Sequence, residues 1–562
     1  MALRPPCRSH SRTFLSLPDE LLLDIFQKVK EYRPTNKALH AGFASSSSQI
    51  AAIRLTCRRF AATSSHLLVH YICLNGLNLH SLEKLEEISR HPLIRKGVSI
   101  IRLELQCYVP NLAEDMGEFA RWAVERVLDL ARRHRRSFEQ EVEISTHEDC
   151  DITESLLKRR DELAVWLRKL KVMLDVWSST SVQKWDKRPT DPSNGTGKSD
   201  QQQKASDVSS CVESEPCIRL LREAHGLYRR RYEDQEALRK DNNFATRFAT
   251  AMSRMPRAKW LEFQDFRHES NVSFDCCSGN DVSQACRGTR ETDECAQLLN
   301  IDSLLEPMSW EEIKDHHYHS PPAEILFTLP VAIQKAGCTL DSILVRTMTQ
   351  AEHYFPLLRN SMYNNSAVLR DAVQAIELKS FAFIHGVDAK TRTRETPTLE
   401  DLEAFKRYIV AMTSSDTLER FRLAVDSDWV SSSFEVEDAL VFGDLISSTR
   451  WRNLRDIHMT GLSIRLEDLE NVHYKLKSNE TSLDFLTFSR VRLISGHWTE
   501  ALEMLREMNI ADKEVLEPTG AECDSLIMPL CSGYERIFGE KSGRGNEAGQ
   551  FINGHIKHNP LR

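Results

Sequence analysis

The chain has 562 residues, of which 41% are hydrophobic and 28% are charged, and its formal net charge is -8. This length is sufficient for about two to four domain-sized units with packed cores. Because a mildly acidic chain has no global attraction for nucleic acid or an anionic membrane, composition argues against both classes of partner.

The cysteine pattern and the N-terminal segment indicate the compartment. The 14 cysteines are scattered from Cys7 to Cys531, without the dense spacing of a disulfide framework, which favours reduced thiols. The first residues lack the apolar core of a secretory signal, and no stretch reaches the ~18 to 20 apolar residues that span a bilayer. We therefore expect a soluble protein of the cytoplasm, the nucleus or both.

Residues 14–75 are predicted to form a compact helical unit. Pro18 falls in the first turn of a helix, where its missing N–H costs nothing, and Pro34 prevents that helix from continuing. Two apolar stripes at helical spacing are Leu17, Leu21, Leu22, Ile25, Phe26 and Val29, and then Ile50, Ile53, Cys57, Phe60 and Ala61. Two or three short helices cannot bury all of these faces alone, so the unit needs the rest of the chain or a partner.

The segments FLSLPDELLLDIFQKV and IRLTCRRFAATSSH resemble an F-box. That resemblance implies a small helical module that binds the adaptor joining F-box proteins to a cullin scaffold. The adaptor-binding pattern of the family falls on Leu17, Pro18, Leu21, Leu22, Ile25, Phe26, Ile53, Leu55, Cys57 and Phe60. Residues 30–49 make a longer link than is usual in the family, and packing of the first helix within its own domain is the alternative.

The remainder, residues 76–530, is expected to form one α/β body. Residues 76–180 indicate a strand followed by long helices, and residues 217–252 indicate another helix. Residues 186–216 and 267–300 are polar, so we predict disordered insertions there. Residues 531–562 are Gly-rich and polar and are expected to form a flexible tail.

The C-terminal half contains a repeated apolar pattern. Residues 453–464 (NLRDIHMTGLSI) and 482–493 (SLDFLTFSRVRL) align at an offset of 29, at the upper edge of the leucine-rich-repeat period. The same spacing begins upstream at Val98, Ala258, Val373 and Leu418. The irregular intervals predict a degenerate array with insertions, in which each short strand shares a core with its neighbours. Ordinary buried strands of an α/β domain are the alternative.

The stretch LTFSRVRLISGHWTEALEMLREM also resembles the repeat-like C-terminal regions of fungal F-box proteins. The resemblance implies a strand, then Gly496 and Trp498, then a helix near residues 499–508. The fold class expected for the whole chain is therefore mixed α/β and helix-rich: a small helical F-box followed by an irregular leucine-rich-repeat-like body.

Several chemical motifs are present only in part. The sequence around residues 194–199 (NGTGKS) lacks the first glycine and the preceding strand of a phosphate-binding loop. Cys276, Cys277, Cys286 and Cys295 lack the close pairs of a structural zinc site, even with the histidines of residues 316–319 downstream. The basic runs at 132–136 and 229–231 are more typical of solvated helix ends than of a binding site. We therefore predict no metal, no cofactor and no catalytic residue.

The functional expectation is a substrate-recognition subunit of a cullin-RING ubiquitin ligase, which binds the small adaptor through the F-box and a target protein through the body. Exposed strand side chains are the usual binding surface of a stacked array. The candidate target contacts are Arg455, Asp456, His458, Asp484 and Thr487. The alternatives are an interaction scaffold that never joins a ligase and, less favoured, an enzyme with an unrecognised active site.

Overall fold

The computed structural model describes most of the chain as two compact units. The described residues are 17–31, 42–147, 154–181, 208–265, 299, 301–310, 312–313, 322–347, 366–385, 399–425, 441, 443, 445, 452–478, 483–520, 523, 532–539 and 546–562. Unit 1 holds the N-terminal helices and all of the named strands, and unit 2 (residues 106–240 and 278–319) is helical. The structure confirms the mixed α/β class and contains a large parallel sheet.

Three helices open unit 1: α1 (Asp19–Glu31), α2 (Gly42–Thr56) and α3 (Arg58–Leu68). Pro18 precedes α1, and Asp19 and Glu20 lie in its first turn, where the helix dipole favours negative charge. The three helices form their own small apolar core. This helical module ends at Leu68, because residues 71–75 already form the first strand of the sheet, so the expected boundary at residue 75 includes one strand too many.

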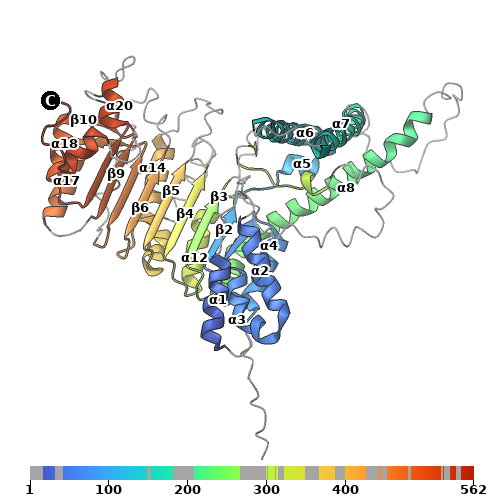
Figure 1. Ribbon diagram of the computed structural model, residues 1–562, viewed down its shortest axis with the longest axis horizontal. Coiled ribbons are helices and arrows are strands. Elements are labelled where there is room, and N and C mark those ends of the chain that lie inside the picture. The colour runs from blue at the N-terminus through green and yellow to red at the C-terminus, as the bar shows by residue number, and fades with distance from the viewer. Residues whose placement is uncertain are drawn as a thin grey trace, which may run out of the picture. The chain divides into compact units, whose positions relative to one another are not determined.

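The sheet has nine parallel strands arranged in the order in which they occur along the chain. Figure 1 shows the row running from β2 through β3, β4, β5 and β6 to β9. The strands are β1 (Tyr71–Asn75), β2 (Ile100–Glu104), β3 (Trp260–Gln264), β4 (Ser342–Thr347), β5 (Ser380–His385), β6 (Arg420–Ala424), β7 (Asp456–Thr460), β9 (Phe485–Ser489) and β11 (Asp512–Leu516).

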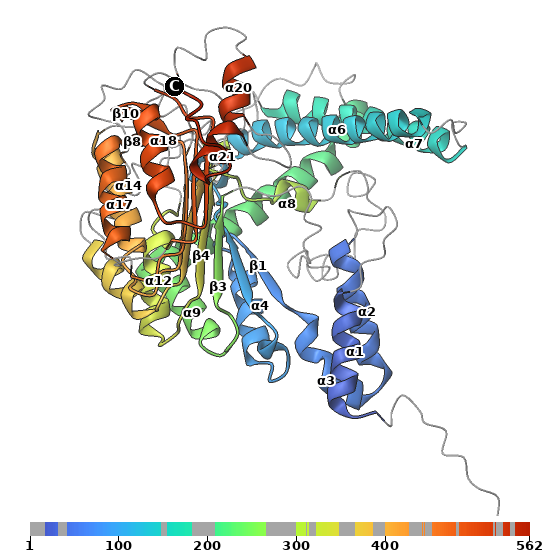
Figure 2. The ribbon, with the colours of Figure 1, turned by 60° about the vertical axis from the view of Figure 1, so that its left-hand side comes forward.

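Helices connect the strands and cover one face of this sheet. They include α4 (Leu79–Arg90), α9 (Asn243–Met252), α12 (Ile325–Lys335), α14 (Leu399–Met412), α17 (Leu466–Lys477) and α18 (Trp498–Glu507). Figure 2 shows α12, α14, α17 and α18 on the same side of the strands. When parallel strands follow one another in a single direction, crossovers of constant hand place every helix on the same face.

Alternation along the strands builds the core of unit 1. Side chains two residues apart point to the helix-covered face, and each of these apolar residues is at most 2% exposed. The two buried rows are Ile72, Ile101, Leu261, Ile343, Phe381, Phe421, Ile457 and Leu486, and Leu74, Leu103, Phe263, Val345, Phe383, Leu423, Met459, Phe488 and Val515. Burial of each such side chain contributes roughly 1.5 to 3 kcal/mol, so these rows are a main source of stability.

The last three strands end in the same way. Gly461, Arg490 and Glu517 immediately follow β7, β9 and β11, and all three have positive φ angles (71°, 50° and 45°). Gly461 N–H donates to Ser489 O (3.0 Å), and Arg490 N–H donates to Leu516 O (2.8 Å). The first two turns lead into β8 (Ser463–Arg465) and β10 (Arg492–Ser495), which pair in parallel. Gly461 and Arg490 are 29 residues apart, which is the offset seen in the sequence.

Part of the expected flexible tail is instead packed against the end of the sheet. The tail contains α20 (Ser532–Phe538) and α21 (Glu547–Ile552), and Phe551 and Ile552 are buried. Asn553 accepts a hydrogen bond from the backbone N–H of Lys513 and donates to its carbonyl, at 3.1 and 2.7 Å. Because an edge strand leaves backbone groups unpaired, these contacts explain why residues 546–562 are held in place.

Unit 2 contains α5 (Pro110–Glu114), α6 (Met116–His147), α7 (Glu154–Ser181), α8 (Val208–Arg239) and the short 3₁₀ helix η4 (Ile301–Leu304). Phe119, Trp122 and Tyr228 form an aromatic cluster with centroids 5.4 to 5.7 Å apart. Burial raises the pKa of Tyr228, whose hydroxyl accepts a hydrogen bond from Val109 N–H. The helix α8 begins within the expected 186–216 insertion; residues 186–207, and nearly all of 267–300, lie outside the described residues.

Candidate protein-binding surfaces

The core of the helical module decides which of the ten predicted adaptor contacts are available. Leu22 is fully buried and Phe26 is 2% exposed. The Phe26 ring packs edge-on against Phe60, with centroids 5.2 Å apart, and Ile50 and Leu67 complete the core. Leu22 and Phe26 therefore hold the three helices together and do not reach the surface.

The other predicted contacts lie at or near the surface. Leu21 is 50% exposed and Leu55 is 88% exposed, and Pro18 is also exposed. Leu17, Ile25, Ile53, Cys57 and Phe60 are partly buried. Exposure of two leucines at positions that match the resembled motif leaves apolar area on the module that its own core does not cover.

Two polar arrangements fix the geometry of this surface. The Arg59 guanidinium donates to the Leu17 carbonyl at 2.6 Å and pairs with Asp19 at 2.6 Å, which ties α3 to the start of α1. Cys57 caps α3, because its Sγ accepts a hydrogen bond from Phe60 N–H at 3.4 Å. The cysteine of the motif thus has a local structural role.

The module is also held closely against the first connection of the sheet. Gly97 follows the short 3₁₀ helix η2 (Ile94–Lys96), and a Cβ atom at Gly97 would lie 1.6 Å from the carbonyl oxygen of His66 in α3. A side chain cannot fit there without displacing backbone. No sequence pattern indicates this contact, because it depends on the approach of two segments about 30 residues apart.

The second face of the sheet, opposite the helix-covered one, carries three of the five predicted target contacts. Asp456 and His458 alternate with buried residues of β7, and Thr487 aligns with His458 in the adjacent strand β9. Burial lowers the pKa of His458, and the positive charge of Arg422 lowers it further. The structure therefore brings Asp456, His458 and Thr487 together on one surface.

Arg455 and Asp484 belong to a different arrangement, which we call the charge ladder. Its members each stand one residue before a strand, are joined by backbone hydrogen bonds and alternate in sign. They are Lys259, Asp341, Lys379, Glu419, Arg455 and Asp484. The Lys379 ammonium lies 3.0 Å from the Asp341 carboxylate, which raises the pKa of Lys379. Because opposite charges alternate across neighbouring strands, the ladder favours the observed register.

Sequence reasoning missed several exposed residues of the second face. Arg420 and Arg422 lie on β6, the exposed ring of Phe485 lies on β9, and Asp512 and Glu514 lie on β11. The sequence pattern already marked Phe421 and Leu423 as inward-facing, so alternation alone could have assigned their neighbours to the second face.

At the β1–β3 end of the second face, the charged side chains are paired within the protein. Arg102 of β2 forms an ion pair with Glu262 of β3 at 2.8 Å, and its guanidinium lies 4.9 Å from the centre of the Tyr71 ring. All three groups are largely shielded from solvent, and burial raises the pKa of the Tyr71 hydroxyl. This end of the face is therefore a structural cluster.

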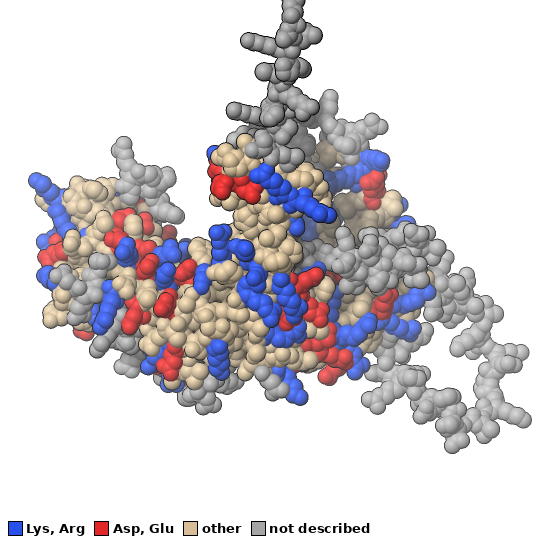
Figure 3. Space-filling model, turned by 90° about the horizontal axis from the view of Figure 1, so that it is seen from below, with Lys and Arg blue, Asp and Glu red and all other residues tan. Residues whose placement is uncertain are grey.

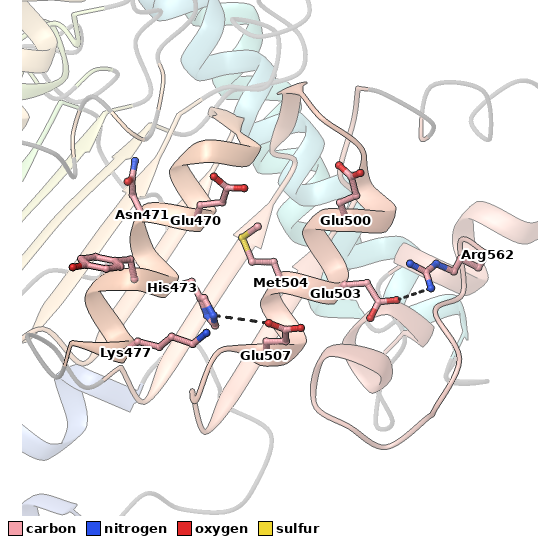
Figure 4. A pocket seen from close by; sticks show the side chains of 10 residues that line it. Glu470, Asn471, His473, Lys477, Glu500, Glu503, Met504, Glu507 and Arg562 are labelled. Atoms are coloured by element: carbon pink, nitrogen blue, oxygen red, sulfur yellow. Dashed lines mark ion pairs between the residues drawn. The ribbon is translucent and has the colours of Figure 1, made fainter.

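A groove of about 700 Å³ lies between α17 and α18, on the helical side of unit 1. Figure 4 shows its side chains: Glu470, His473 and Lys477 come from α17, and Glu500, Glu503 and Glu507 come from α18. His473 Nε2 lies 3.9 Å from Glu507, and Arg562 lies 3.7 Å from Glu503. Carboxylates outnumber cationic groups in this groove, and neighbouring cationic side chains partly neutralise the carboxylates.

Charged groups elsewhere are mixed in sign. In the described part visible in Figure 3, Lys and Arg side chains are interspersed with Asp and Glu. In the basic runs of unit 2, Arg133 and Arg135 pair with Asp129 and Glu139, and Arg229 pairs with Glu233. These pairs, each four residues apart on a helix, are typical of a solvated helical surface.

Metal-binding clusters and membrane-spanning helices are absent from the described ranges. No group of three or more His, Cys, Asp or Glu side chains there is arranged to hold a metal ion. Among the helices of those ranges, none combines the length and apolar content needed to cross a bilayer. The incomplete phosphate-loop motif and the Cys276–Cys295 and His316–His319 groups lie outside the described residues.

Comparison with known proteins adds no family assignment to this geometry. No protein-family model matches the sequence, and no curated protein is significantly similar to it.

Proposed function

We propose that this protein is a substrate-recognition subunit of a cullin-RING ubiquitin ligase, with an F-box at residues 17–68 and a degenerate leucine-rich-repeat-like body. The observation that carries the proposal is the pair of exposed leucines, Leu21 and Leu55, at positions of the resembled F-box motif. A partner that covers them gains roughly 1.5 to 3 kcal/mol for each leucine fully buried.

The body supports the same proposal through its architecture. Nine parallel strands in sequential order, with their helices on one face, are the arrangement expected of stacked strand–helix units. The equivalent turns at Gly461, Arg490 and Glu517 support a repeat-like origin. The insertion of unit 2 between β2 and β3 accounts for the irregular spacing of the sequence pattern.

The proposed mechanism is positioning and requires no catalytic side chain in this chain. The F-box fixes the protein on the adaptor, and the body holds a target within reach of the transferred ubiquitin. Tethering the two reactants raises their effective concentration. The close packing of Gly97 against α3 supports this mechanism, because a rigid junction preserves the geometry between the two binding surfaces.

Co-purification with the small adaptor tests the proposal. The full chain is compared with the double variant Leu21→Asp/Leu55→Asp and with the control Val172→Asp, which alters an apolar residue on α7 that is 64% exposed. We expect the wild type and the control to retain the adaptor, and the double variant to lose at least ~10-fold in affinity, the effect of about 1.4 kcal/mol.

The ligase proposal and the interaction scaffold predict different outcomes of this experiment. Failure of the correctly folded wild type to bind adaptor would refute the ligase proposal and favour an interaction scaffold. Equal binding by the wild type and the double variant would show that the exposed leucines are not the contact. Circular dichroism of all three proteins controls for unfolding.

A further inference from the structure

The second face of the sheet is strongly polarised between β6 and β11. Arg420 and Arg422 are exposed on β6, two residues apart and therefore on the same face. Asp512 and Glu514 are exposed at the equivalent positions of β11. The register aligns Arg420 with Asp512 and Arg422 with Glu514 through the two intervening strands.

The two arginines have no ion-pair partner within the described part of the chain. This distinguishes them from Arg102 on the same face, which is paired with Glu262. Between the arginines and the acidic strand, Phe485 exposes 46% of its surface. Across the sheet, the row from Arg420 therefore passes Asp456 of β7 and the exposed Phe485 before it reaches the acidic strand β11.

From this arrangement we infer that the target is a protein segment of mixed charge, which lies across the strands. An acidic residue of the segment pairs with Arg420 and Arg422, an apolar residue packs on Phe485, and a basic residue pairs with Asp512 and Glu514. This inference deepens the proposed function, because it rests on the sheet being the target-binding surface.

The spacing of the charges follows from the sheet. Three strand-to-strand steps of about 4.8 Å separate β6 from β11 by roughly 14 Å. An extended segment advances about 3.4 Å per residue, so its acidic and basic residues are about four positions apart. Guanidinium groups bind carboxylates in a bidentate manner, which favours a carboxylate at the β6 end.

A polyanion fits this surface poorly. Asp456 lies on β7 immediately beside Arg420, and the acidic strand β11 lies beyond it. A nucleic acid bound at the arginines would bring its further phosphates near these carboxylates. The net charge of -8 adds to that repulsion.

Selection of 12-residue random peptides displayed on phage, with the full-length protein as bait, tests the inference. We expect wild-type selections to be enriched at least ~10-fold, relative to the library, in sequences with an acidic and a basic residue about four positions apart. The variant R420E/R422E should instead select peptides with basic residues at both positions, since both ends of its surface are acidic.

Two further variants and one further ligand complete the experiment. R420K/R422K keeps the charge and should retain the wild-type preference, as should R370E, which reverses an exposed charge in the helical segment 366–375. Identical selections by R420E/R422E and the wild type, or no charge spacing in the selected peptides, would overturn the inference. So would tighter binding of a fluorescent 20-base-pair duplex DNA than of the selected peptides.

This result is independent of adaptor binding. The peptides test the strands of the sheet, whereas co-purification tests the leucines of the helical module. Loss of the charge preference with normal adaptor binding would reject only the inference. Absence of adaptor binding with the expected peptides would reject the ligase proposal and leave the inference about the surface in place.

Discussion

The same substitution at two leucines of the helical module should have different consequences for its stability. Leu22 is fully buried among α1, α2 and α3, whereas Leu55 is 88% exposed at the end of α2. Leu22→Ala removes buried methyl groups and leaves a cavity, which costs about 2 to 5 kcal/mol. Leu55→Ala removes atoms that water already surrounds, so its effect on stability is within about 0.5 kcal/mol.

Hydrogen–deuterium exchange of the module measures this difference locally. Each 1.4 kcal/mol is about tenfold in an equilibrium constant, so Leu22→Ala should accelerate exchange of protected amides in residues 19–31 and 49–68 by roughly 30-fold or more. Global unfolding is a less suitable measure, because a chain with several units need not unfold in one step. Peptides from β5 and β6 provide an internal control, since neither variant touches the sheet.

When only the folded fraction of each variant is considered, Leu55→Ala should reduce the affinity for the adaptor more than Leu22→Ala does. Leu55→Ala is expected to weaken binding with unchanged exchange, whereas Leu22→Ala acts by reducing the folded population. If Leu22→Ala left the exchange of the module unchanged, its assignment to the core would be wrong. If Leu55→Ala accelerated exchange as much as Leu22→Ala, the leucine would have a structural role and the proposed contact would lose its basis.

Three further predictions concern the sheet and its junctions. Gly97→Ala forces backbone apart at His66 and should destabilise the junction by about 1 to 3 kcal/mol, seen as faster exchange in α3; unchanged exchange would show that the junction adapts freely. Asn553→Ala unpairs backbone groups at the β11 edge, so we expect a local loss of about 1 to 3 kcal/mol, seen as faster hydrogen–deuterium exchange in β11, and concentration-dependent self-association by light scattering. The pKa of His458 is lowered by burial and by Arg422, so stability should fall as pH drops from about 6.5, the ordinary histidine value, towards the lowered pKa. Arg422→Gln should raise the His458 pKa in histidine exchange mass spectrometry; a fall in that pKa would contradict the assigned cause.

The sign of the pH effect follows from protonation of the two states. The unfolded chain binds a proton at His458 more readily than the folded chain does, because the folded environment disfavours the charge. Acidification through pH 6.5 therefore stabilises the unfolded state relative to the folded one. Above that range both states are neutral at His458, and the effect disappears.

Local patterns in the sequence identified six of the nine strands of the sheet and the first helix, but not β1, β4 or β11. Alternating apolar residues such as Phe381 and Phe383 identified strand positions, and the stripe through Leu22 and Phe26 identified α1. Such patterns are readable because a buried face imposes a period of about two residues on a strand and 3.6 on a helix. The mixed α/β class could be predicted for the same reason.

Tertiary structure alone decided which of these residues are available to a partner. Leu21 and Leu22 are adjacent and chemically identical, yet α2 and α3 cover only Leu22. Likewise, Arg455 belongs to the charge ladder, whereas its neighbour Asp456 lies on the second face. Asn553 is held in place because β11 presents unpaired backbone groups to it. Periodicity fixes the direction of a side chain relative to its own element, whereas its exposure depends on segments distant in the sequence.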